Sequence, residues 1–181
     1  VKPGDTAAVI GTGMIGFAAA AWAKVLGAES VFVVGRSEEK RAIAEKIPGI
    51  TYVTEQESDT IEADVVVEAV GTPQAISKAI LLAKPGGSIV LMGNPSGDIS
   101  MEKTVYWRIL RKQLTVTGTW NSSYEKDKAC DWTEALDALL QKKIPAEALM
   151  THCFSSDRLM EGLELMKNHK EPYCKVMVSG E

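Results

Sequence analysis

The sequence has few of the residues that build metal clusters or disulfide frameworks. Its 181 residues include three cysteines and two histidines. The cysteines, Cys130, Cys153 and Cys174, lie more than twenty residues apart, which excludes the paired-cysteine motifs of structural zinc sites. An odd number of cysteines at such distances favours free thiols in a reducing compartment, so we expect a cytoplasmic protein.

Long apolar runs and an excess of one charge are also lacking. No stretch reaches the roughly 18 consecutive apolar residues of a membrane-spanning helix, so no membrane association is expected. The net charge is −4 with both signs interspersed, which argues against nucleic acid as a partner. A hydrophobic content of 45% is typical of a soluble globular protein. The opening residues Val1–Asp5 carry no signal-peptide pattern and are typical of the middle of a longer chain.

Glycine carries the most specific signal in the chain. An apolar stretch over residues 6–10 is followed by G-x-G-x-x-G and then by a helix rich in small residues. Gly11 permits the tight turn, Gly13 lets backbone approach a phosphate, and Gly16 lets the helix pack closely on the strand. The first N–H groups of that helix would face the phosphates. The pattern predicts that residues Gly11, Thr12, Gly13, Met14, Ile15 and Gly16 bind a dinucleotide pyrophosphate.

Strand and helix patterns alternate along the rest of the chain. We expect strands at residues 6–10, 30–34, 50–53, 63–69, 88–92 and 114–119, and helices at 15–26, 38–46, 73–83 and 104–112. This alternation predicts an α/β fold, a doubly wound parallel Rossmann sheet of order 3-2-1-4-5-6. Residues 1–125 would form this dinucleotide-binding domain.

The pattern changes in residues 126–181. We expect helices at 128–140 and 156–168 and strands at 149–154 and 174–178. These C-terminal helices and strands would be appended to the Rossmann domain. They would pack back on it and toward an N-terminal catalytic domain that this chain does not contain.

The end of the second strand bears on the choice of coenzyme. An NAD site usually has Asp or Glu there to bind the ribose hydroxyls, but this chain has Gly35-Arg36-Ser37. Gly35 would make room for a 2′-phosphate, and the Arg36 guanidinium and the Ser37 hydroxyl would bind it. Lys40 would add charge one helical turn later. We therefore predict NADP(H) as coenzyme, with NAD(H) as second choice.

Several stretches carry a family resemblance. Lys2–Thr6, Glu68–Gly71 and Val90–Gly93 resemble the coenzyme domain of medium-chain, zinc-type alcohol and polyol dehydrogenases, and Arg108–Trp120 is similar to the galactitol-1-phosphate dehydrogenase branch. The resemblance covers nearly the whole chain. It implies that Val70, Gly71 and Thr72 lie near the adenine, and that Met92, Gly93 and Asn94 reach the nicotinamide. It also implies a homodimer formed through the edge strand at residues 114–119.

The resemblance implies an oxidoreductase that transfers hydride between the coenzyme and a polyol, sugar phosphate or other secondary alcohol. In this family an N-terminal domain supplies the catalytic zinc, which lowers the pKa of the alcohol. No such ligand set occurs here, so we expect neither catalytic nor metal-binding residues in this chain, which alone would bind coenzyme without turnover.

Other functions remain as alternatives. A zinc-independent quinone or enoyl reductase would share the fold, and a non-catalytic nucleotide-sensing module would need an exposed apolar surface, which the sequence does not predict. Tyr124 and Lys128 have the spacing of the catalytic pair in short-chain dehydrogenases, but they lie in a polar stretch without the partner serine. An S-adenosylmethionine methyltransferase would require an acidic residue in place of Gly35.

Overall fold

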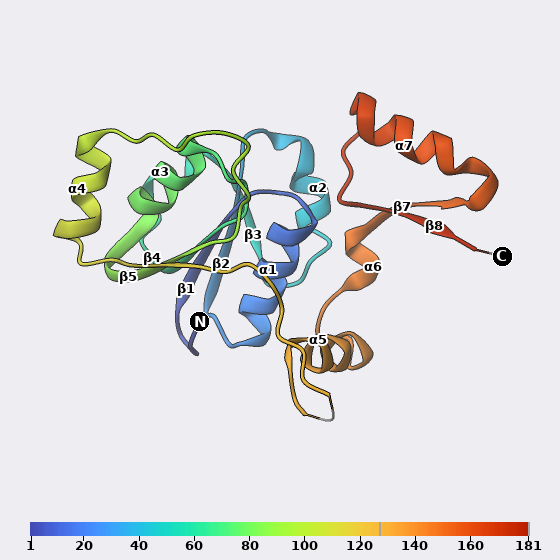
Figure 1. Ribbon diagram of the computed structural model, residues 1–181, viewed down its shortest axis with the longest axis horizontal. Coiled ribbons are helices and arrows are strands. Elements are labelled where there is room, and N and C mark those ends of the chain that lie inside the picture. The colour runs from blue at the N-terminus through green and yellow to red at the C-terminus, as the bar shows by residue number, and fades with distance from the viewer. Residues whose placement is uncertain (127, 181) are drawn as a thin grey trace.

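A computed structural model describes residues 1–126 and 128–180 and contains the predicted parallel sheet (Figure 1). Its order is β3-β2-β1-β4-β5-β6, which confirms the predicted strand order, and every pairing is parallel. The central strands are rich in valine and alanine, as expected for strands that are buried on both faces. The strands are β1 (Thr6–Ile10), β2 (Ser30–Gly35), β3 (Thr51–Thr54), β4 (Ala63–Glu68), β5 (Ala83–Leu91) and β6 (Thr115–Gly118).

Helices cover the two faces of this sheet, and alternate strand residues divide the core between them. Ala7 and Val9 of β1 face one buried cluster, which contains α1 (Met14–Val25) and α2 (Arg41–Ala44). Ala8 and Ile10 face the other, beneath α3 (Pro73–Leu82) and α4 (Lys103–Arg111). This period-two division follows from strand geometry. Because all six strands are parallel, their carboxyl ends lie at one edge of the sheet.

The C-terminal part forms a separate two-stranded sheet. Figure 1 shows α7, β7 and β8 to one side of the main sheet, with α5 and α6 between. Leu149 and Cys174 are nevertheless buried in the same cluster as Phe17 of α1, so this part shares the main core. The elements are α5 (Asp131–Leu140), α6 (Ala146–Leu149), β7 (Met150–Ser155), η3 (Ser156–Arg158), α7 (Leu159–Asn168) and β8 (Lys175–Ser179), and β7 pairs with β8 in parallel.

Some predicted elements differ from the structure. The helix expected at 38–46 is a 3-10 turn, η1 (Glu38–Lys40), followed by the short α2. The Arg41 side chain donates there to Glu38 and to the Tyr52 carbonyl. Residues 84–87, between the helix expected at 73–83 and the strand expected at 88–92, are part of β5, which shifts register there. Two short elements, η2 (Glu57–Thr60) and α6, were not predicted because four residues carry no periodic signal.

An apolar surface is exposed, contrary to the prediction. Trp132, Leu136 and Leu140 on α5 are 58%, 55% and 80% exposed, and Trp120 is 77% exposed. Helical periodicity places these α5 residues on one side of the helix, but periodicity alone does not say whether that side is covered. No helix in the described part of the chain is long and apolar enough to cross a membrane.

Candidate functional site

The glycine turn lies at the carboxyl edge of the sheet, between β1 and α1. Gly11 has a φ of +117°, a backbone conformation that side chains rarely adopt. A Cβ on Gly16 would lie 2.0 Å from the Gly11 carbonyl oxygen, so close packing requires glycine there. Gly13 has open space where its side chain would be. The first bond within α1 joins the Phe17 N–H to the Gly13 carbonyl, which leaves the preceding N–H groups available to an anion.

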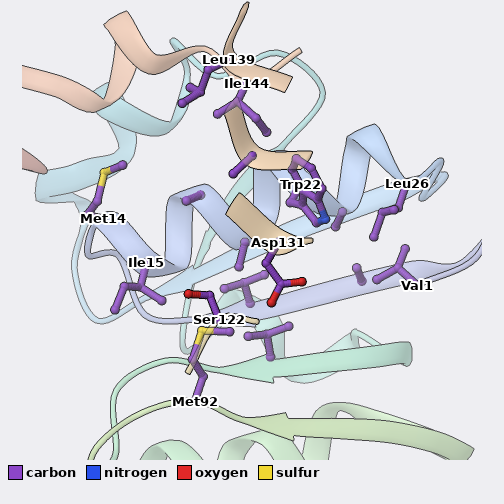
Figure 2. Close-up of a pocket in the computed structure, with 17 residues that line it drawn as sticks. Val1, Met14, Ile15, Trp22, Leu26, Met92, Ser122, Asp131, Leu139 and Ile144 are labelled. Atoms are coloured by element: carbon purple, nitrogen blue, oxygen red, sulfur yellow. The ribbon is translucent and has the colours of Figure 1, made fainter. Parts of the chain in front are cut away.

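Cavities lie on both sides of this turn. A mixed polar and apolar groove of about 690 Å³ runs from Gly11–Gly13 to the ends of β2 and β4, where Gly35, Arg36 and Val70 line it. A more apolar cavity of about 670 Å³ lies on the other side, beside α1. Figure 2 shows that Met14 and Ile15 from the first turn of α1, and Met92 beyond β5, lie around it. An extended ligand that crosses the glycine turn can therefore occupy both cavities.

The turns after β4 and β5 meet at two glycines. Gly71 has a φ of +83°, and a Cβ there would lie 2.6 Å from the Asn94 carbonyl oxygen. A Cβ on Gly93 would lie 2.1 Å from the Gly71 backbone nitrogen. Thr72 caps α3, and its hydroxyl accepts from the Ala75 N–H at 3.2 Å. Gly71, Gly93 and Asn94 thus act through backbone packing, whereas Val70 and Thr72 line the groove.

Glu68, which the sequence analysis did not assign to the site, organises these turns. The side chain is 1% exposed, and its Oε1 accepts from the N–H groups of Val70 and Gly71, each at 2.7 Å. Its carbonyl accepts from the N–H groups of Met92 and Gly93. The other carboxylate oxygen is buried without a partner among the described residues. The sequence places Glu68 at the end of β4, but whether its side chain points into the protein depends on how the sheet is assembled.

We expect Glu68→Ala to lower the free energy of unfolding by about 3 kcal/mol, because two buried N–H groups lose their charged acceptor. Glu68→Gln is the matched control, since the amide oxygen can still accept both bonds, and its loss should be less than half as large. Chemical denaturation of both variants measures the difference. Equal losses would mean that the two N–H bonds do not account for the role of Glu68.

The structure gives Gly35 a packing role that the sequence did not predict. A Cβ on Gly35 would lie 1.9 Å from the Tyr52 hydroxyl and 2.9 Å from Thr12 Cγ2. The missing side chain therefore makes room for Tyr52 of β3, and Gly35 also lines the groove, so its predicted place beside a 2′-phosphate stays a prediction. Burial raises the pKa of Tyr52, and its protonated hydroxyl donates to the Ser37 carbonyl at 2.5 Å. Tyr52 thus holds the turn that presents Arg36 and Ser37.

Three basic side chains near this turn have different surroundings. Arg41 forms ion pairs with Glu38 and Glu57. Lys40 donates to the Thr12 carbonyl at 3.1 Å, and its pKa is lowered mainly by burial, so an anion nearby would favour its charged form. Arg36 is exposed, and no hydrogen bond or ion pair engages its side chain within residues 1–126 and 128–180. Arg36 is therefore the cation most available to a ligand.

Other residues of the site were not predicted. Glu55, Gln74 and Ala75 line the groove, and residues 169–173 lie beside Arg36 and Lys40. Glu55 and Gln74 follow strand ends, a position that could have marked them. Residues 169–173 reach the site only through tertiary packing.

The Tyr124–Lys128 pair receives no support as a catalytic pair. Tyr124 is 70% exposed, and Lys128 Nζ pairs with Glu125 at 2.7 Å, an arrangement typical of a solvated surface. No group of three or more His, Cys, Asp or Glu side chains converges as a possible metal site in the described residues. No zinc chemistry is therefore assigned to the described residues.

Comparison with known proteins places this geometry in a family. The family model described as zinc-binding dehydrogenase matches residues 15–141. Galactitol 1-phosphate 5-dehydrogenase of Escherichia coli K12 is 29% identical over 154 residues, which are 80% of this chain and 44% of that protein. The crystal structure of galactitol-1-phosphate dehydrogenase from Escherichia coli superposes with a TM-score of 0.82 at 26% identity, over 96% of this chain and 53% of that one.

Two more distant structures share the fold and hold nicotinamide coenzymes. An Escherichia coli CFT073 alcohol dehydrogenase, solved with NADH, has a TM-score of 0.80 at 23% identity, over 98% of this chain and 53% of that one. A zinc-binding dehydrogenase of Sinorhizobium meliloti, bound to NADP, has a TM-score of 0.74 at 23% identity, over 99% and 52%.

The chain spans about half the length of the relatives that it matches. The family match covers more than two thirds of the chain and includes α1 through α5. Together with the strand order and the glycine turn, this match shows that the chain belongs to the zinc-binding dehydrogenase family.

Proposed function

We propose that this chain is the coenzyme-binding part of an oxidoreductase that transfers hydride between NADP(H) and a polyol, sugar phosphate or other secondary alcohol. One observation carries the proposal: the glycine turn lies between a mixed polar groove and an apolar cavity, each large enough for half of a dinucleotide. The adenosine would occupy the groove, the pyrophosphate would lie over Gly11–Gly16, and the nicotinamide would reach Met92.

The residues present fit the coenzyme. Gly13 leaves its Cβ position open at the start of α1, and Arg36 has no competing partner in the described part of the chain. When bound, the nicotinamide supplies a hydride acceptor or donor. The chain's own residues bind and orient it, with Met14, Ile15 and Met92 providing apolar surface that excludes water. The similarity to galactitol 1-phosphate 5-dehydrogenase of Escherichia coli supports a polyol or sugar-phosphate substrate.

The residues around the expected position of the adenosine ribose favour NADP(H) as the coenzyme. The Arg36 guanidinium and Lys40 ammonium lie where the 2′-phosphate would project, and neither Gly35 nor Ser37 offers a carboxylate to ribose hydroxyls. Glu55 supplies a carboxylate to the same groove, and it is the one observation that favours NAD(H) as second choice.

We expect Arg36→Ala to weaken NADPH binding by about 10-fold to 100-fold, because a charge-assisted bond to phosphate contributes about 1.5–3 kcal/mol. NADH binding should change less than threefold. Arg158→Ala is the matched control, since Arg158 pairs with Glu161 far from the groove. Isothermal titration of both coenzymes at one salt concentration measures the affinities. Preference for NADH in the unmodified protein would overturn the NADP(H) proposal.

We further propose that residues 1–125 form the dinucleotide-binding domain and that residues 126–180 pack against it. A second domain would cover the open apolar cavity and would contribute the zinc ion and the residues that bind substrate. Exposed Trp120 and Trp132 and the apolar lining of the cavity support such a cover. Without it, this chain would bind coenzyme but not turn over. The free thiols are consistent with a cytoplasmic location.

We also propose a homodimer through β6. It is the edge strand of the sheet, and all four of its residues are exposed, which makes its unpaired backbone groups available to a second copy. Sedimentation equilibrium should give twice the chain mass. A monomer over the micromolar range would contradict this assembly without affecting coenzyme binding.

A further inference from the structure

A third cavity, of about 500 Å³, adjoins the coenzyme groove at the Arg36 turn. Thr12, Arg36 and Lys40 line both the groove and this cavity, so the two are continuous at the place where a 2′-phosphate would lie. The opposite wall is the turn between α7 and β8, residues 169–173, which we call the C-terminal wall. It stands more than 120 residues from Arg36 in the sequence.

Two contacts hold the C-terminal wall against the coenzyme site, one made by Tyr173 of the wall and one by Cys174, the residue that follows it. Lys40 Nζ lies 5.2 Å from the centre of the Tyr173 ring, and that ring stacks on His169 with centroids 6.0 Å apart. Cys174, the next residue, is buried, and its Sγ lies 4.0 Å from Met14 Sδ in the first turn of α1. The wall is therefore held against the glycine turn and against Lys40.

The charges around this cavity suit a dianion. The lining has three basic side chains, Arg36, Lys40 and Lys170, and two acidic ones, Glu39 and Glu171. The Glu171 carboxylate lies 3.3 Å from His152 Nε2, and Lys170 Nζ is only 3.9 Å from the exposed Glu164. A phosphate monoester, which carries between one and two negative charges, would find a net positive surface with donors on two sides.

His169 ends α7 in the left-handed conformation, with φ 47° and ψ 42°. Gln113 and Lys142 have the same backbone just after α4 and α5, so this conformation is a common helix end in this chain and is not by itself a sign of a ligand site. The His169 imidazole lines the cavity beside Tyr173 and can donate a hydrogen bond in either protonation state.

From this arrangement we propose that the C-terminal wall is part of the 2′-phosphate site, and that His169 and Lys170 determine specificity by binding the phosphate opposite Arg36. The inference rests on the proposed function, since it assumes that the adenosine ribose lies in the groove. It assigns coenzyme specificity to a segment outside the six-stranded sheet.

The test uses adenosine 2′,5′-bisphosphate and AMP as probes, because the pair differs only in the 2′-phosphate. We expect His169→Gly and Lys170→Met each to weaken bisphosphate binding by about threefold, and the double variant by about tenfold, with AMP binding unchanged. Lys167→Met is the matched control, because Lys167 lies on α7 and is exposed. His169→Gly should also leave the melting temperature equal or higher, because glycine suits the left-handed backbone. A merely structural role for His169 would not produce this combination.

The outcomes separate the two proposals. If the variants bind both probes like the unmodified protein while Arg36→Ala loses the bisphosphate preference, the C-terminal wall takes no part and only this inference fails. If the unmodified protein does not distinguish the two probes, the NADP(H) proposal fails and this inference fails with it. Equal weakening of AMP and bisphosphate would also overturn it, because the wall would then act without contacting the 2′-phosphate.

Discussion

Gly13→Ala is expected to remove most coenzyme affinity while leaving the fold intact. Gly13 has a φ of −85°, which alanine adopts readily, and no protein atom lies within 4 Å of the position its Cβ would occupy. The added methyl group would stand where the pyrophosphate approaches the backbone. If the overlap between this methyl group and the pyrophosphate costs about 2 kcal/mol, the dissociation constant of NADPH should rise by roughly 30-fold.

Calorimetric titration with NADPH measures the loss, and thermal unfolding of the same sample checks the fold. Gly97→Ala is the matched control, because it also has open space at the Cβ position but lies away from the glycine turn. Unchanged NADPH affinity in Gly13→Ala would contradict the placement of the pyrophosphate over residues 11–16.

Gly16→Ala is expected to have the larger effect on stability. Its Cβ would lie 2.0 Å from the Gly11 carbonyl oxygen and 2.9 Å from the carbonyl carbon, and these backbone atoms cannot move without shifting α1 against β1. We expect a loss of about 3 kcal/mol or more, because backbone overlap in a packed core is relieved only by displacing an element. The melting temperature should fall by roughly 6–12 °C.

The pair of variants separates folding from binding. Gly13→Ala should change affinity without stability, and Gly16→Ala should change stability first and affinity as a result. Thermal unfolding of Gly16→Ala without coenzyme measures the stability term alone. A melting temperature within 2 °C of the unmodified protein would show that the close approach of α1 to Gly11 is not required.

The order of the sheet could be predicted because its signals are local. Apolar strands such as Val31–Val34, separated by helical patterns, admit few topologies under the rules for parallel crossovers. The glycine turn was predictable because its pattern is local in the sequence: Gly16 packs on Gly11, five residues earlier.

The details that could not be predicted depend on residues distant in the sequence. Gly35 is required by the Tyr52 hydroxyl, 17 positions later, and the sequence alone favoured a ligand phosphate in that space. The direction of Glu68 follows from the turns that it holds, and the C-terminal wall meets Lys40 only after β8 joins β7. Helical periodicity indicates that the apolar residues of α5 share one side of the helix, but whether that side is exposed depends on which other elements cover it.

The most direct test of this account is an amide chemical-shift titration of the protein with NADPH. We predict that the largest changes occur at Gly11–Gly16, with further changes at 35–40, 69–75 and 92–94, where the adenosine and nicotinamide ends would lie. Saturable binding with shifts confined to other regions, or no shifts at millimolar NADPH, would contradict the claim that the coenzyme lies across the glycine turn.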